Sequence, residues 1–79
     1  MIKISVFTKD ENSILLGEFD CYHIFMSDKM EISINMSFKE QLKLIELLIK
    51  NYVLFKVQGD TITLILESNN FQRVNFRFH

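Results

Sequence analysis

The chain has 79 residues, of which 48% are hydrophobic, and its formal net charge is −1. This length leaves room for a single domain, residues 1–79, and the high hydrophobic fraction excludes an intrinsically disordered chain. A net charge close to zero also excludes strong attraction of the whole molecule to nucleic-acid phosphates or lipid headgroups.

The first 36 residues predict three strands. Residues 2–8 alternate apolar and polar side chains, as a half-buried strand does, and residues 30–36 show the same alternation most clearly. Between them, residues 13–26 are rich in aliphatic and aromatic side chains. We expect this segment to be one long strand, with Gly17 as a candidate bulge site.

A helix should follow at residues 38–50. Ser37 and Glu40 have the spacing of a capping box, in which the serine hydroxyl accepts from the third amide of the helix. Lys50 suits the negative helix end and forms a favourable i,i+4 pair with Glu46. We expect one apolar stripe of this helix to face the sheet: Phe38, Leu42, Ile45 and Ile49.

The helix carries more apolar residues than one core-facing stripe needs. Leu44, Leu47 and Leu48 widen its apolar sector to roughly 220°, well beyond the ~100° that is typical of a surface helix. We therefore interpret these three leucines as an exposed flank, available to a protein partner or to a second copy of the chain. An exposed sheet edge is the alternative contact surface.

Three strands are predicted after the helix, at residues 52–58, 61–67 and 71–78. The first two flank Gly59 and Asp60, a pair typical of a tight hairpin turn, and a second turn is expected at residues 68–70. The predicted order is β-β-β-α-β-β-β. It favours an α+β fold in which one central helix packs on a single antiparallel sheet of about five or six strands.

The strands also hold a second set of apolar residues, opposite those expected to face the helix. One helix covers only one sheet face, so two interpretations stay open: a strongly curved sheet that buries both sides, or a face for protein binding or self-association. The set consists of Phe7, Leu15, Phe19, Val53, Phe55, Val57 and Ile65.

The last strand places Val74, Phe76 and Phe78 on one face and its two arginines on the other. The simple interpretation is a core face and a solvated face. The alternative is a nucleic-acid contact, in which Lys56, Arg73 and Arg77 form a basic stripe and Phe71 or Phe55 provides a stacking surface. The motif of an RNA-recognition sheet is absent from the sequence.

Catalytic chemistry has little support. Cys21 and His23 are two residues apart, but a zinc site needs about four ligands in paired spacings. We therefore interpret Cys21 as a small buried hydrophobic residue. Four acids could approach one another, as strand-edge charges or as a contact patch for a basic partner: Glu18, Asp20, Asp28 and Glu31. We expect no catalytic residue, metal site or cofactor.

Composition indicates a source and a compartment. Alanine and proline are absent whereas isoleucine, lysine and asparagine are plentiful, a bias typical of AT-rich genomes such as those of low-GC bacteria and their phages. Cys21 has no cysteine partner within the chain, which favours the cytoplasm. No signal peptide and no apolar run of the ~20 residues that span a bilayer are visible, so we expect no membrane insertion.

In size, compactness, composition and lack of catalytic groups, the chain resembles two broad classes of small protein. One class is the early phage proteins that disable host machinery, and the other is the immunity and antitoxin proteins. The resemblance covers no specific motif. It implies a non-enzymatic module that binds and blocks a host protein, with a homodimer as a further option; the alternative is the nucleic-acid-binding module.

Overall fold

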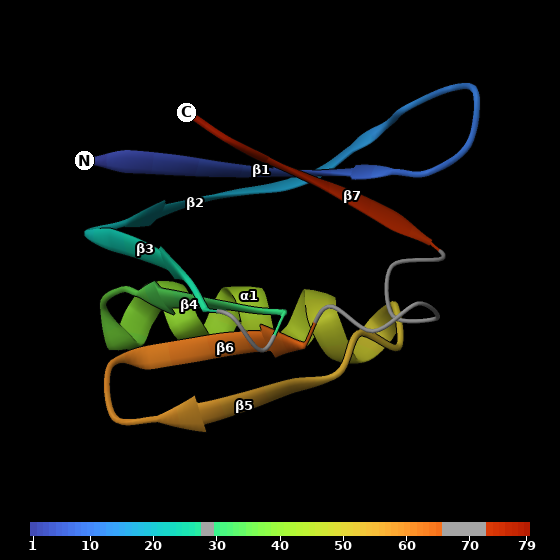
Figure 1. The fold of residues 1–79 in the computed structure, drawn as a ribbon. Helices are drawn as coiled ribbons and strands as arrows, with labels where there is room; N and C mark the ends of the chain where they lie inside the picture. Colours follow the sequence, from blue (N-terminus) through green and yellow to red (C-terminus); the bar gives the residue numbers. More distant parts are fainter. Residues whose placement is uncertain (28–29, 66–72) are drawn as a thin grey trace.

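The computed structural model describes residues 1–27, 30–65 and 73–79, which form one helix and seven strands (Figure 1). The α+β class is confirmed. The predicted turn at residues 68–70, Asp28 and Phe71 lie outside the described residues. The elements, in chain order, are β1 (Ile2–Thr8), β2 (Leu15–Cys21), β3 (His23–Met26), β4 (Glu31–Asn35), α1 (Phe38–Lys50), β5 (Phe55–Gln58), β6 (Thr61–Ile65) and β7 (Val74–Phe78).

The prediction of a single sheet is wrong, because the strands form two antiparallel sheets. The first sheet has the order β2-β1-β7 and the second has the order β3-β4-β6-β5. The predicted long strand at residues 13–26 is divided at Tyr22. Cys21 still pairs with Ile2 of β1, whereas the Tyr22 amide donates to the Asn35 carbonyl, 2.8 Å away in the second sheet.

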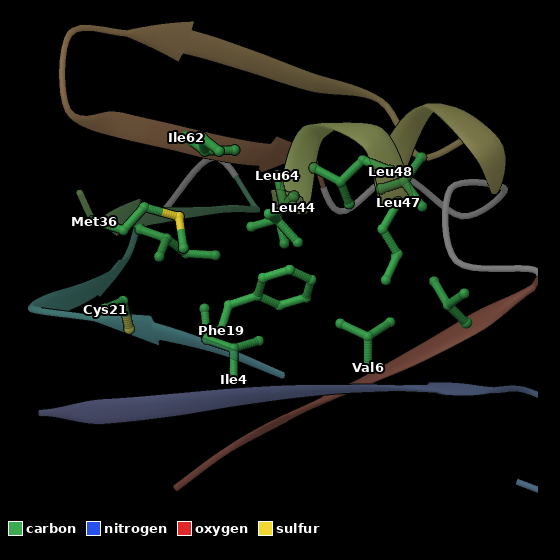
Figure 2. Close-up of a cluster of buried hydrophobic side chains, with 13 residues drawn as sticks. Ile4, Val6, Phe19, Cys21, Met36, Leu44, Leu47, Leu48, Ile62 and Leu64 are labelled. Carbon is green, nitrogen blue, oxygen red and sulfur yellow. The ribbon is translucent and has the colours of Figure 1, made fainter. Parts of the chain in front are cut away.

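The core fills the space between the two sheets and the helix. Figure 2 shows Ile4, Val6 and Phe19 of the first sheet pointing towards α1 and β6. This arrangement explains how the chain buries part of the second apolar set of its strands. The side chains are covered by the opposite sheet, and not by the curvature of a single sheet. Phe19 and Val53 of that set are buried, whereas Leu15 and Val57 stay exposed.

The β1–β2 hairpin contains the irregularity that Gly17 suggested. Val6 pairs with Gly17 but Phe7 pairs with Leu15, so the register skips Leu16. A β-carbon at position 17 would lie 2.9 Å from the Phe19 ring, which explains why glycine fits here. The predicted bulge is therefore present, with its extra residue one position before Gly17.

The helix has the predicted bounds. The Ser37 hydroxyl accepts a hydrogen bond from the Glu40 amide at 3.3 Å, as in the predicted capping box. The Glu40 carboxylate does not complete the box; it accepts instead from the Asp20 amide of β2 at 3.3 Å. It thereby connects the first turn of α1 to the edge of the first sheet.

Replacing Ser37 with alanine should lower the free energy of unfolding by about 1 kcal/mol, because the Glu40 amide loses its acceptor. Urea denaturation measures this loss. Ser37→Asp keeps an acceptor at the cap, so it should retain stability close to that of the unchanged chain. Equal losses in both variants would contradict a capping role.

The Gly59-Asp60 hairpin is confirmed. Gln58 pairs with Thr61 across this two-residue turn, and Gly59 has φ +60°. The left-handed region is costly for residues with a β-carbon, so glycine suits the first turn position. The last strand, β7, pairs antiparallel with β1, from Ile4 opposite Phe78 to Thr8 opposite Val74.

Candidate protein-binding surface

Helix α1 has two apolar faces. One face lies in the core, where Leu44 and Leu48 are fully buried and Leu47 is 9% exposed. The other face is open: Phe38 is 71% exposed, Leu42 54% and Ile49 61%. Together with the partly buried Ile45, these residues form one line along the helix, and we call this line the outer helix stripe.

The sequence-based orientation of the helix is therefore wrong. The stripe expected to face the sheet is the exposed one, and the leucines expected to form a contact flank, Leu44, Leu47 and Leu48, belong to the core (Figure 2). Both rows have helical spacing, so periodicity alone does not choose between them.

Gln41 explains the inversion. It lies among the buried residues of the helix and is only 1% exposed. A buried face assigned from apolar residues alone would not include a glutamine. The burial is possible because the Gln41 Nε2 group donates to the Gly59 carbonyl at 3.0 Å, and a hydrogen-bonded amide loses little on burial. This bond joins residues that are 18 positions apart.

The outer helix stripe has a basic border. Lys39, Lys43 and Lys50 are exposed on the adjacent side of the helix, with Glu46 as the acid among them. Lys50 pairs with Glu46 at 3.6 Å, as predicted, and Lys43 pairs with Glu40 at 3.5 Å. Lys39 has no ion pair within the described ranges, so the border carries net positive charge.

The apolar surface continues from the helix towards the second sheet. Around the helix axis, Ile45 is the residue of the outer helix stripe nearest to Gln41, and Gln41 contacts the β5–β6 turn. Val57 of β5 pairs with the buried Ile62, so it lies on the face of the second sheet that packs on the core, and it is 47% exposed. The stripe therefore borders the outer strand of this sheet.

The predicted basic stripe does not form. Lys56 belongs to the second sheet, where its Nζ atom lies 3.0 Å from the Glu31 carboxylate. Arg77 belongs to the first sheet, and its guanidinium group is stacked 4.8 Å from the centre of the Phe7 ring. Arg73 is stacked at 4.8 Å over Tyr52. The two arginines are exposed, but they face aromatic partners that sequence reasoning missed, because these pairs depend on strand pairing and on a loop after α1.

Cys21 and His23 lie in strands of different sheets, and so do Asp20 and Glu31. Cys21 is 1% exposed, and burial together with the nearby Asp20 charge raises the pKa of its thiol. His23 is exposed and begins a strand of the other sheet. Glu31 is likewise separated from Asp20, which pairs with Lys3 at 3.8 Å. Residues 1–27, 30–65 and 73–79 contain no group of three potential metal ligands.

The β1–β2 loop has its own local organisation. The Asp10 carboxylate accepts from the Thr8 hydroxyl at 3.0 Å and from the amides of Asn12 and Ser13. These hydrogen bonds, with that from Thr8 contributing most, hold the pKa of Asp10 below its ordinary value. The carboxylate therefore orders a turn through its Oδ1 atom.

Comparisons with known proteins add no relative: no family model, no curated protein and no solved structure matches this chain. Among the residues that the structure describes, no helix has the length and apolar character needed to cross a membrane. The functional argument therefore depends on the surfaces of the molecule itself.

Proposed function

We propose that this chain is a non-enzymatic protein-binding module that docks through the outer helix stripe. The observation that carries the proposal is the exposure of Phe38, Leu42 and Ile49 in one line on a helix whose other apolar face already fills the core. Large apolar side chains that are aligned on a surface cost free energy in water, and such patches commonly mark protein-binding sites.

The partner we propose is a bacterial host protein with an apolar surface that is bordered by acidic residues. The apolar part would accept the outer helix stripe, and the acids would face Lys39, Lys43 and Lys50. Complementary charges of this kind increase the rate and the specificity of association. Occupation of the partner's surface is how a module without catalytic groups would inhibit it.

Substitutions within the stripe test the proposal. The tagged chain is used to capture partners from a nuclease-treated lysate of a low-GC bacterium, and the captured protein is purified for titration. Leu42→Asp and Ile49→Asp should each weaken its binding at least ~10-fold, which corresponds to about 1.4 kcal/mol. Both positions are exposed, so circular dichroism should show an unchanged fold.

Phe25→Asp is the matched control. Phe25 is 62% exposed but lies on β3, at the opposite edge of the second sheet from β5, so its replacement should leave binding unchanged. Equal binding by Leu42→Asp and Phe25→Asp would refute the assignment of this surface. If material is captured only when the nuclease is omitted, the nucleic-acid alternative through Arg73 and Arg77 gains support at the expense of the protein-binding proposal.

A further inference from the structure

A second surface, separate from the outer helix stripe, lies between β2 and α1. A cleft of about 430 Å3 runs along the edge of the first sheet there. Its walls include Leu16 and Glu18 on the strand, and Lys43, Leu47 and Lys50 on the helix. Since β2 is the outer strand of the order β2-β1-β7, the cleft borders a strand edge that has no neighbouring strand among the described residues.

The backbone groups of Glu18 point into this cleft. On the other side of β1, the Lys3 amide and carbonyl both bond to His79, so Lys3 and Asp20 face each other as a pair without mutual backbone hydrogen bonds. The Asp20 amide accordingly points away from β1, where the Glu40 carboxylate accepts from it. Glu18, two residues earlier, has the same orientation, and its N–H and C=O have no partner within the described residues.

The side chains that line the cleft favour a partner strand whose residues alternate between basic and apolar. The Glu18 carboxylate is exposed and has no ion pair in the described part of the chain, whereas Asp20 is paired with Lys3. On the core side of the same edge, Leu47 provides an apolar wall, and the 40% exposed Leu16 lines the cleft at the bulge. A strand added beside β2 would alternate between these two faces.

We propose that this cleft binds an extended peptide segment of another protein as an additional strand on β2. The segment would place a basic residue opposite Glu18 and apolar residues at the alternate positions, towards Leu16 and Leu47. About three residues would pair with β2 from Gly17 to Phe19, because the Asp20 amide already donates to the Glu40 carboxylate. Main-chain hydrogen bonds to Glu18 supply affinity, and the alternating side chains supply specificity.

A second copy of the chain does not satisfy these requirements. Two β2 edges pairing antiparallel about Glu18 would place the two Glu18 carboxylates directly opposite each other, and like charges in that position are destabilising. The Lys43 and Lys50 side chains are already paired with Glu40 and Glu46. The unpaired carboxylate of Glu18 is therefore the charge that selects a basic segment.

Blocked heptapeptides test the proposal by isothermal titration. The probe is acetylated, amidated SVKVKVS, and the comparison is the same peptide with both lysine amides N-methylated, which removes the donors that would face Glu18. Binding of SVKVKVS that is at least ~10-fold tighter than that of the methylated peptide supports strand addition. Equal binding of the two peptides, or no binding of SVKVKVS, would overturn the proposal.

Variants of the protein locate the site. Glu18→Pro removes the outward amide, which is tolerated on an edge strand because no sheet hydrogen bond is lost, and it should abolish binding of SVKVKVS. Val57→Pro is the control: its amide also points outward, on the edge strand β5 of the second sheet, and binding should persist. Glu18→Lys should reverse the preference towards the acidic peptide SVEVEVS; an unchanged preference would contradict the role of Glu18.

Discussion

Replacing Leu48 with alanine should lower the free energy of unfolding by about 2–5 kcal/mol, the usual cost of removing a buried leucine side chain. Leu48 is fully buried within the core cluster. The same replacement of Leu42, which is 54% exposed on the same helix, should change stability by no more than about 0.5 kcal/mol. The two variants remove the same atoms, so the difference between them measures burial alone.

Urea denaturation gives both values, and thermal unfolding gives an independent check. For a domain of this size, each 1 kcal/mol shifts the midpoint by about 4–8 °C, so Leu48→Ala should unfold at least about 6 °C below Leu42→Ala. A larger loss of stability for Leu42→Ala than for Leu48→Ala would contradict the observed orientation of α1. It would indicate that Leu44, Leu47 and Leu48 lie at the surface.

Replacing Phe19 with alanine should cost about 3–5 kcal/mol, because it leaves a cavity where the first sheet packs against the helix. Phe19 is 5% exposed, and its ring lies beside Leu47 above Gly17. A domain of 79 residues has a total stability of about 4–12 kcal/mol, so this variant should lose at least about a quarter of it.

Phe25→Ala provides the control for Phe19→Ala. Phe25 is 62% exposed, and its replacement should leave the unfolding midpoint nearly unchanged. Far-ultraviolet circular dichroism as a function of urea concentration separates the two variants. Equal midpoints would show that the first sheet is not held to the helix through Phe19.

The local elements could be predicted from sequence because their signals lie within a few residues of one another. The bounds of α1 follow from Ser37 and from the apolar spacing after it, and the β5–β6 hairpin follows from Gly59 and Asp60. Alternation likewise identified the strands at residues 2–8 and 30–36, which became β1 and β4.

The arrangement of these elements depends on contacts between distant residues, which a local pattern does not contain. The apolar run at residues 13–26 is continuous in sequence, yet a bend at Tyr22 assigns its two halves to different sheets. Helix α1 buries the face that contains Gln41, whose side-chain amide bonds to the Gly59 carbonyl 18 positions away. Because of this orientation, the candidate binding surface is the outer helix stripe and not Leu44, Leu47 and Leu48, which lie in the core.

The pairing of β7 with β1 also affects the order in which the fold can form. Both backbone groups of Lys3 bond to His79, so the first sheet is completed only when the two extremes of the described chain meet. The β3–β4 and β5–β6 hairpins close over short loops, whereas the β1–β7 pair must close over most of the chain, at a greater entropic cost. We therefore expect β7 to join last during folding and the overall rate to be slower than that of a helical bundle of equal length.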